Sequence, residues 1–578
     1  MSRFSVWAPH AGVVEVAARG RLQRLEVGDR GWHHLDDPQT GPGDDYRFVL
    51  DGGPALPDPR SAWQPDGVHG PSRVVDHAAF PWTDRGWQGR ILSDCVIYEM
   101  HCGTFSEAGT FDGAIEHIAH LVALGAGAVE VMPVAAFPGS RGWGYDGVAL
   151  FAVHEEYGGP NGLKRFVDAC HRAGLAVVMD VVYNHLGPDG NVLGEYGPYF
   201  TERHRTPWGD AVNYDGAGSD EVRRFVIDNA VMWLRDYHCD GLRLDAIHAV
   251  VDTSAVHIVE EIASTVHELS AELNRPLWVI AESDLNDPRV VRDPSAGGHG
   301  CDAQWSDDFH HALHSTLTGE RSGYYADFGS VAAVAASLHH VFVNPGQYSR
   351  FRERRHGRGV GDLPATRFLG YLQNHDQVGN RARGERSAAM LSTGRLQIGA
   401  ALVLLGPFVP MLFEGEEWAA STPFQYFTDH QDAGLAAAVS AGRRSEFASF
   451  GWQPDEVPDP QDPATFARSK LRWTEVESGQ HLAMLRWHAA LIALRAARPG
   501  LRDGNRSLLT VDFDESARRL VMRRDGVMVA CNWGDATITI DVEDAATPVL
   551  LSEKATTHAG RLHLQPDSVA IMVGGPRP

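Results

Sequence analysis

The chain has 578 residues, of which 43% are hydrophobic and 22% are charged, and this composition excludes a largely disordered protein. Its formal net charge of −24 repels phosphate backbones and anionic lipids, so we expect no nucleic acid and no membrane among its partners. The sequence shows neither an apolar run of about 18 residues nor a signal peptide, and we therefore expect a cytoplasmic protein.

The N-terminal part alternates short apolar runs with turn residues. These runs lie at residues 4–7, 13–16 and 46–50, and their length and spacing predict an immunoglobulin-like β-sandwich. Residues 51–89 are rich in Pro, Gly, Asp and Trp, which indicates a linker packed against the next domain. We place the first domain, with its linker, at residues 1–89.

From about residue 94, apolar runs of strand length alternate with amphipathic stretches of helix length. This alternation, repeated many times, predicts an α/β fold of the (β/α)8 TIM barrel type at residues 90–499. The predicted strands are 95–98, 128–132, 175–180, 241–245, 277–282, 368–372 and 409–413, with a weaker sixth strand near 301–305. The predicted helices include 112–124, 163–173, 220–237, 252–273 and 481–497.

Beyond Pro499 the short strands return, and we expect a C-terminal antiparallel β-sandwich at residues 500–578. Its predicted strands are 508–511, 520–522, 527–530, 538–540 and 570–573.

Several polar residues stand where the barrel strands end. In a TIM barrel the working residues lie at the C-terminal ends of the strands. Any one of these residues alone is explained by an ordinary structural role, as a helix cap or in a surface ion pair. Their joint placement on four strands favours an active site instead. They are Asp180, Asn184, His185, Arg243, Asp245, Glu282, His375 and Asp376.

The spacing of these residues indicates a chemistry. Arg243 and Asp245 are two residues apart on a strand, so they point to the same side, and the Arg favours the ionised Asp. Glu282 follows an apolar strand, and such surroundings raise the pKa of a carboxyl group, as a general acid requires. Adjacent strands lie about 4.7–4.9 Å apart. Asp245 and Glu282 can therefore reach the separation of about 5–5.5 Å that a retaining glycosidase needs, with Asp376 as a third carboxylate.

At these residues the sequence resembles the α-amylase family, glycoside hydrolase family 13. The four short signature regions of that family match in order, at residues 180–185, 241–248, 279–283 and 373–377. The resemblance implies that Asp245 is the nucleophile, Glu282 the acid/base and Asp376 the transition-state stabiliser. It also implies that the substrate-binding residues include Arg243, His185, His375, Asp180, Asn184, Trp143 and Tyr145, the last in a loop that resembles the one stacking under the sugar.

Longer stretches resemble the trehalohydrolase members of this family. They include residues 304–311, 373–381 and 413–418, and His248 stands where many amylases have Lys, next to the predicted +1 subsite. The implied reaction is hydrolysis of the α-1,4 bond beside the terminal trehalose of maltooligosyl-trehalose, with release of trehalose. A functional pairing with the synthase that makes this substrate is a further expectation.

Other readings stay open at this point. A branching or debranching enzyme of the same family is the first, although residues 180–185 lack the pattern usual in branching enzymes. A non-catalytic homologue that binds glycan or a protein partner is more remote, because Asp245, Glu282 and Asp376 are all present.

We expect no cofactor and no required metal. Asn184 matches a calcium-binding position of many amylases, but the other ligands cannot be traced, and we expect its side chain to hold the loop by hydrogen bonds. The six cysteines form no C-x-x-C pair, which disfavours a zinc site or a disulfide framework and predicts free, buried thiols.

Two further features of the sequence point to sugar contacts. Trp208, Trp305 and Phe328 are candidates for stacking on sugar faces. The arginine-rich run at 350–358 is either a solvated loop or a donor of hydrogen bonds to a polyhydroxyl ligand.

Overall fold

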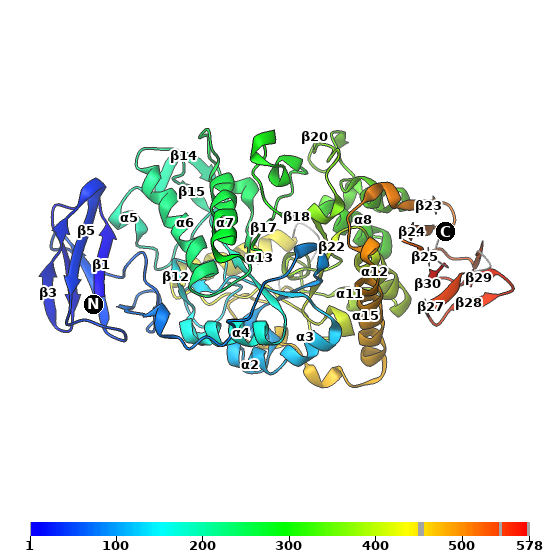
Figure 1. The fold of residues 1–578 in the computed structure, drawn as a ribbon, viewed down its shortest axis with the longest axis horizontal. Helices are drawn as coiled ribbons and strands as arrows, with labels where there is room; N and C mark the ends of the chain where they lie inside the picture. Colours follow the sequence, from blue (N-terminus) through cyan, green and yellow to red (C-terminus); the bar gives the residue numbers. More distant parts are fainter. Residues whose placement is uncertain (1, 449–452, 454–455, 543–545, 575–578) are drawn as a thin grey trace.

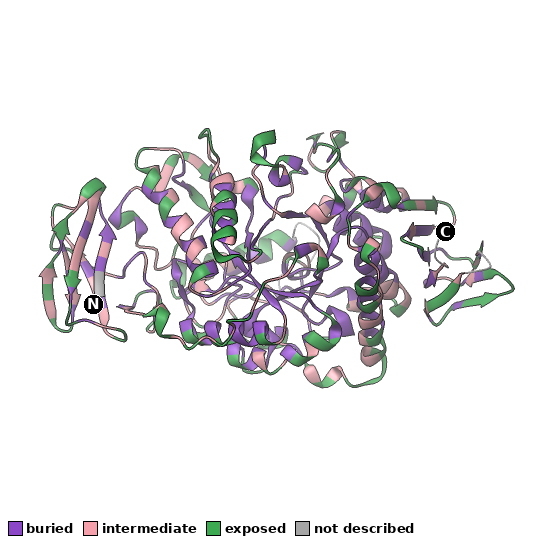
Figure 2. Ribbon diagram, in the orientation of Figure 1, coloured by how far each residue is buried: buried purple, intermediate pink, exposed green. Residues whose placement is uncertain are grey.

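The computed structural model describes residues 2–448, 453, 456–542 and 546–574. The molecule is elongated, with antiparallel sheets at both ends and a closed barrel between them (Figure 1). The barrel is the largest part and carries most of the buried residues, while exposed residues cover the terminal sheets and outer helix faces (Figure 2).

The barrel consists of eight parallel strands, which close because the last strand pairs with the first. This confirms the predicted TIM barrel, including its weak sixth strand. In spatial order the strands are β9 (Ile97–Met100), β10 (Ala128–Val131), β13 (Ala176–Val181), β16 (Gly241–Leu244), β17 (Trp278–Ala281), β18 (Ala303–Trp305), β21 (Phe368–Gly370) and β22 (Val409–Phe413).

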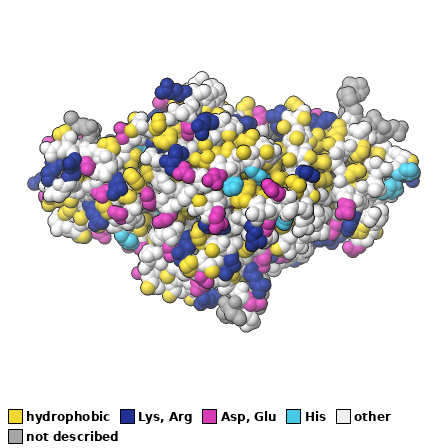
Figure 3. Space-filling view, turned by 90° about the horizontal axis from the view of Figure 1, so that it is seen from below, with side chains coloured by type: hydrophobic (Ala, Val, Ile, Leu, Met, Phe, Trp, Pro, Cys, Tyr) yellow, Lys and Arg dark blue, Asp and Glu magenta, His cyan; other side chains and the backbone are white. Residues whose placement is uncertain are grey.

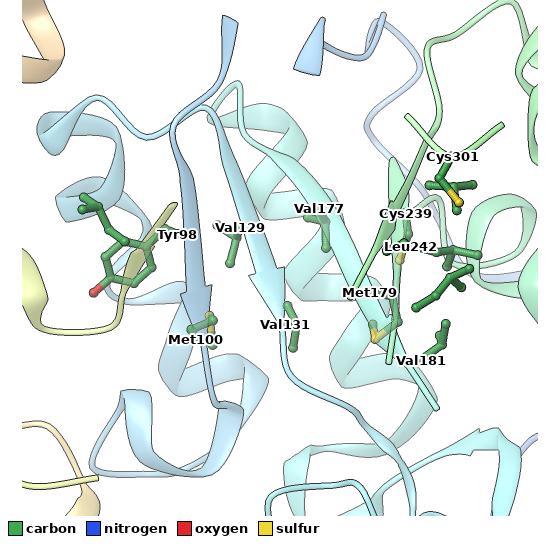
Figure 4. Packing of buried hydrophobic residues seen from close by; sticks show 14 of the residues in the cluster. Tyr98, Met100, Val129, Val131, Val177, Met179, Val181, Cys239, Leu242 and Cys301 are labelled. Atoms are coloured by element: carbon green, nitrogen blue, oxygen red, sulfur yellow. The ribbon is translucent and has the colours of Figure 1, made fainter. Parts of the chain in front are cut away.

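Side chains alternate between the two faces of each barrel strand, as the period of two requires. One set packs against the surrounding helices, and Figure 4 shows its members Met100, Val131 and Met179 on the neighbouring strands β9, β10 and β13. The alternate set, which includes Ile97 and Val178, forms a separate cluster inside the barrel. The apolar interior therefore lies directly beneath any polar group at the C-terminal end.

The outer helices agree with the predicted pattern, with two differences. Predicted helix 112–124 is broken into α2 (Phe111–Ile115) and α3 (Ile118–Leu124), and His117 at the break stacks on Trp473 at 3.7 Å between ring centroids. The helix predicted at 252–273 begins later, as α7 (Ile258–Leu273). The others are α4 (Gly159–Arg172), α6 (Ser219–Arg235) and α15 (Gly479–Ala497).

Both terminal regions contain the expected antiparallel strands. The N-terminal sheets are built from β1 (Ser2–Trp7), β2 (Val14–Ala18), β3 (Arg21–Arg24), β4 (Glu26–Val27), β5 (Trp32–Asp37), β6 (Asp45–Leu50), β7 (Ala55–Leu56) and β8 (Ser72–Arg73). The C-terminal sheets are built from β23 (Thr510–Asp514), β24 (Arg519–Arg524), β25 (Val527–Asn532), β26 (Ile538–Asp541), β27 (Thr547–Leu551), β28 (Ala555–His558), β29 (Arg561–Leu564) and β30 (Ser568–Val573). Sequence patterns did not predict β27, β28 or β29.

The surface carries charges of both signs. On the face shown in Figure 3, acidic and basic side chains are interspersed with hydrophobic ones. None of the helices in the described ranges combines the length and the apolar character that crossing a bilayer requires. All six cysteines are buried free thiols, as the sequence predicts.

Candidate active site

One buried guanidinium joins carboxyl groups from three adjacent barrel strands. Arg243, on β16, is fully buried, and its Nη1 lies 2.8 Å from Asp180 Oδ2 and 2.9 Å from Asp245 Oδ1. Its Nη2 lies 2.9 Å from Glu282 Oε2. Below it, the guanidinium stacks on Trp305 at 4.3 Å from the ring. The strand order therefore brings Asp180 and Glu282, from the two neighbouring strands, to the Arg243–Asp245 pair at the end of β16.

The remaining contacts of Asp245 and Glu282 differ. Asn184 Nδ2 donates to Asp245 Oδ2 at 3.0 Å, while Asn184 Oδ1 lies 3.1 Å from His185 Nδ1. Glu282 Oε2 accepts the backbone N–H of Ala246 at 2.7 Å. Because one guanidinium contacts both carboxyl groups, they stand as close neighbours. The separation of about 5–5.5 Å that a retaining glycosidase needs stays a prediction.

Enclosure at the end of the barrel shifts the acidity of these groups. Burial raises the pKa of Glu282, and Arg243 only partly opposes this effect. The direction agrees with the sequence-based expectation, although 18% of the Glu282 side chain is accessible to solvent. Burial also raises the pKa of Asp180 to about 7, against the opposing effect of Arg243.

A second chain of hydrogen bonds fixes Tyr145 and His375. Tyr145 Oη donates to Asp180 Oδ2 at 2.7 Å and lies 2.8 Å from His375 Nε2. Glu99, on β9, binds the other side of this histidine, with Oε1 2.5 Å from His375 Nδ1 and Oε2 accepting its backbone N–H at 2.8 Å. Burial lowers the pKa of His375, but the charge and hydrogen bond of Glu99 raise it more, so the net direction is upward.

Asp376 follows His375 at the start of α10 (His375–Gly379), which Asn374 caps by accepting the N–H of Gln377 at 2.7 Å. Its Oδ1 accepts from Asn380 Nδ2 at 2.5 Å. Burial raises the pKa of Asp376, with His375 acting in the opposite direction. The carboxyl group is partly exposed at the same rim as Glu282.

Trp143 lies behind this site. Only 6% of the residue is exposed, its Nε1 donates to the carbonyl of Gln425 at 3.0 Å, and its ring lies 5.6 Å from that of His375. Its ring packs edge-on against the ring of His375 and so supports it.

The three further aromatic candidates have different environments. Trp208 is 51% exposed at the turn between β14 (Phe200–Thr206) and β15 (Gly209–Val212), and its ring stacks on His185 at 4.2 Å. Trp305 and Phe328, in contrast, are 1% and 5% exposed. The expectation of sugar stacking is wrong for these two, because they pack in the interior, Trp305 beneath Arg243 and Phe328 against His311.

The predicted +1 side carries His248, which is exposed just after the nucleophile strand. The arginine-rich run reaches the same region through Arg352, whose Nη2 donates to Asp284 Oδ2 at 3.0 Å. The rest of the run is largely exposed. Arg352 thus contacts a residue that follows Glu282 by two positions, which places this part of the loop next to the site.

Two buried carboxyl groups escaped the sequence analysis. Glu99 and Glu130 are direct partners in the register of β9 and β10, and both are almost fully buried. Among the residues that the structure describes, neither oxygen of Glu130 has a hydrogen-bond partner, and burial raises its pKa well above the usual value. The sequence did contain a signal for both residues, because each is a glutamate in the middle of an apolar strand. Such a side chain is rarely buried without a role.

Within the ranges that the structure describes, no group of three or more His, Cys, Asp or Glu side chains is arranged to hold a metal ion. At the position that resembles a calcium ligand, Asn184 makes hydrogen bonds with its neighbours. The absence of a required metal stays a prediction.

Comparison with known families places this site in context. The model described as the α-amylase catalytic domain matches residues 85–203, and that of a domain of unknown function, DUF3459, matches residues 505–571. A crystal structure of a putative α-amylase from Salmonella typhimurium superimposes with a TM-score of 0.90 at 37% identity, covering 99% of this chain and 97% of that one.

Full-length relatives are closer in sequence. The chain is 55% identical to malto-oligosyltrehalose trehalohydrolase of Arthrobacter ramosus over 99% of both chains. It is 52% identical to the protein of the same name from Mycobacterium tuberculosis strain H37Rv, over 92% of this chain and 93% of that one. The chain therefore belongs to the malto-oligosyltrehalose trehalohydrolase family, within the α-amylase family of glycoside hydrolases.

Proposed function

We propose that this enzyme hydrolyses the α-1,4 bond next to the terminal trehalose of maltooligosyl-trehalose and releases trehalose. The observation that carries the chemistry is the pair Asp245 and Glu282 held by one guanidinium, that of Arg243. The substrate rests on the near full-length identity to trehalohydrolases. The reaction is a double displacement with retention at the anomeric carbon.

Each carboxyl group has a distinct role in the proposed reaction. Glu282, whose pKa burial raises, protonates the glycosidic oxygen, and trehalose leaves. Asp245, oriented by Arg243 and Asn184, attacks the anomeric carbon and forms a glycosyl-enzyme. Glu282 then takes a proton from water, which releases the maltooligosaccharide. Asp376 stabilises the positive charge that develops on the sugar ring.

The contacts around the triad define how the sugar is bound. Tyr145 and His375 form one wall of the −1 position, with ring centroids 5.1 Å apart, and His185 adds a further contact with Trp208 stacked on it. Asp180 fixes both Tyr145 and Arg243. We assign the exposed His248 to recognition of the trehalose end, because it follows the nucleophile by three residues.

The deciding experiment offers the purified protein a maltooligosyl-trehalose and a plain maltooligosaccharide of matched length, followed by chromatography of the products. Rapid release of trehalose from the first and slow attack on the second is the expected result. Equal hydrolysis of both would indicate an amylase, and cleavage of α-1,6 bonds a debranching enzyme. Transfer of chains without trehalose, with changed iodine staining of glucan, would indicate a branching enzyme.

Other parts of the assignment are also proposals. We place the domain boundaries at residues 89/90 and 499/500, locate the enzyme in the cytoplasm, and pair it functionally with the synthase that makes its substrate. Limited proteolysis tests the boundaries, because cleavage between domains should leave a stable fragment close to 90–499.

A further inference from the structure

We propose that Arg443, in helix α13 (Ala433–Ala448), is a positioning residue of the reaction, which directs the carboxyl group of Asp376 through the side chain of Asn380. This inference rests on the proposed function, because it concerns the third carboxyl group of the same site. Arg443 lies outside every stretch of sequence on which the family resemblance rests.

The helix that carries Asp376 needs support at both ends. Asp376 lies in the first turn of α10, which has only five residues. A helix this short is not stable by itself, so the direction of the Asp376 side chain depends on what holds the helix. Asn374 caps its start by accepting the N–H of Gln377. Its end needs a partner as well, because the last carbonyl groups of a helix lack donors within the helix.

The guanidinium of Arg443 supplies donors for that end. Its Nη2 donates to the carbonyl oxygen of Gly379 at 2.6 Å and to that of Arg381 at 3.4 Å. Its positive charge faces the C-terminal end of α10, where a cation is favourable. A residue 64 positions further along the chain than Gly379 therefore holds the end of α10 in place.

The same guanidinium reaches Asp376 through one amide. Arg443 Nη1 donates to Asn380 Oδ1 at 3.3 Å, and Asn380 Nδ2 donates to Asp376 Oδ1 at 2.5 Å. A guanidinium only donates and a carboxylate only accepts, so these two partners determine which way the amide between them is turned. Asn380 is itself exposed, and Arg443 is the contact that keeps its amide directed at Asp376.

The burial pattern of α13 sets Arg443 apart from an ordinary surface arginine. Among the positions of this helix whose burial is described, the buried ones are Ser440, Arg443 and Phe447, which share one face. The central carbon of the guanidinium lies 4.6 Å from the centre of the Phe447 ring and 5.3 Å from that of Tyr426. A buried charge is costly unless its donors are bonded, so the contacts with α10 account for an arginine at this position.

The next residue of the same helix offers a matched comparison. Arg444 is exposed, and its Nη2 pairs with Asp459 Oδ2 at 2.8 Å. Asp459 also accepts from Ser440 of α13 at 2.6 Å. The pair of Arg444 therefore attaches α13 to another part of the chain, and its loss shows what weaker attachment of the helix does when the contacts of Arg443 are kept.

The proposed role of Asp376 determines which kinetic constant should respond. Asp376 stabilises the charge that develops on the sugar, so its direction matters most in the transition state. A carboxyl group that is less well directed should lower kcat and leave KM nearly unchanged. A merely structural role of Arg443 would change the stability of the protein without this division between the two constants.

The test measures kcat and KM for trehalose release by three single variants. Arg443→Met keeps an apolar side chain against Phe447 and Tyr426 but has no donor, and we expect kcat to fall by about 3- to 10-fold. Asn380→Leu removes the hydrogen bond to the carboxyl group itself, and we expect a fall of about 10- to 100-fold. KM should change by less than about twofold in both. Arg444→Met should match the wild type in both constants.

The double variant Arg443→Met with Asn380→Leu shows whether the first residue acts through the second. It should be no slower than Asn380→Leu alone, because the contact that Arg443 supports is already lost. Losses that multiply in the double variant would overturn the inference, as would an Arg443→Met enzyme as fast as Arg444→Met. A raised KM with unchanged kcat in Asn380→Leu would make Asn380 a sugar contact and would also overturn it.

Arg443→Lys provides a further variant if Arg443→Met fails to fold. Lysine keeps the positive charge, but its single nitrogen cannot replace the two that bond Gly379 and Asn380. Its kcat should still fall with KM unchanged, and a kcat equal to that of the wild type would count against the inference. If the wild-type enzyme hydrolyses plain maltooligosaccharide but releases no trehalose, the proposed function fails, and the same comparison on maltooligosaccharide still tests the role of Arg443.

Discussion

Replacement of Glu99 by Gln tests whether a buried ion pair holds the sugar-binding histidine. Glu99 accepts two hydrogen bonds from His375, and glutamine can preserve the one from the backbone N–H. The substitution removes the charge-assisted hydrogen bond between the Glu99 carboxylate and His375 Nδ1. Hydrogen bonds to charged groups contribute about 1.5–3 kcal/mol, and each 1.4 kcal/mol corresponds to about tenfold in rate. We expect kcat/KM for trehalose release to fall by about 10- to 100-fold.

The pH dependence of stability makes this prediction specific. The pKa of folded His375 is raised, so the stability due to its proton is fully present below the unfolded value of about 6.5 and is lost as pH rises through the folded pKa. The Gln variant loses this contribution. Its urea midpoint should therefore fall furthest below wild type near pH 6, and the difference should shrink near pH 9. An equal difference at both pH values would refute the ion pair as the cause.

Three other outcomes follow from the site. Asp245→Asn should lower kcat by at least about 10⁴-fold, because the glycosyl-enzyme cannot form, and substantial residual trehalose release would exclude Asp245 as nucleophile. Trp208→Ala, which removes a half-exposed ring stacked on His185, should raise KM by about tenfold with a smaller effect on kcat, as loss of an aromatic contact worth about 0.5–1.5 kcal/mol allows. Exhaustive chelation should leave the activity intact, and loss that calcium restores would contradict this.

The barrel could be predicted because its signal is local. Each strand is a short apolar run, and the predicted runs lie within two residues of the observed strands. The boundaries that failed depend on distant partners. The break at His117 serves a stack with Trp473, more than 300 residues away in the sequence. The start of α7 is delayed because Asp252 binds Arg223 and the N–H of Ile258, at 2.7 Å each.

The same distinction applies to the site. Asp245, Glu282 and Asp376 stand at strand ends and in short motifs, so sequence alone singles them out. Glu99 and Glu130 become meaningful only when β22 closes onto β9 and the barrel interior exists. Trp208 lies on a hairpin whose first strand is almost entirely polar, which leaves no alternation of apolar and polar residues to detect. Trp305 and Phe328 show the opposite error, because an aromatic residue near a motif does not reveal which way its ring points.

Arg243 alone, which the sequence suggested, does not explain the different roles proposed for Asp245 and Glu282. Arg243 contacts both Asp245 and Glu282, so its charge alone does not distinguish their roles. The asymmetry comes from the other contacts. Asp245 receives a second donor on its other oxygen from Asn184, which fixes the direction of its side chain. On Glu282 the ion pair with Arg243 and the N–H of Ala246 meet at the same oxygen, Oε2, while Asp245 repels its negative charge. In the proposed reaction, Asn184 thus helps to orient Asp245 as the nucleophile.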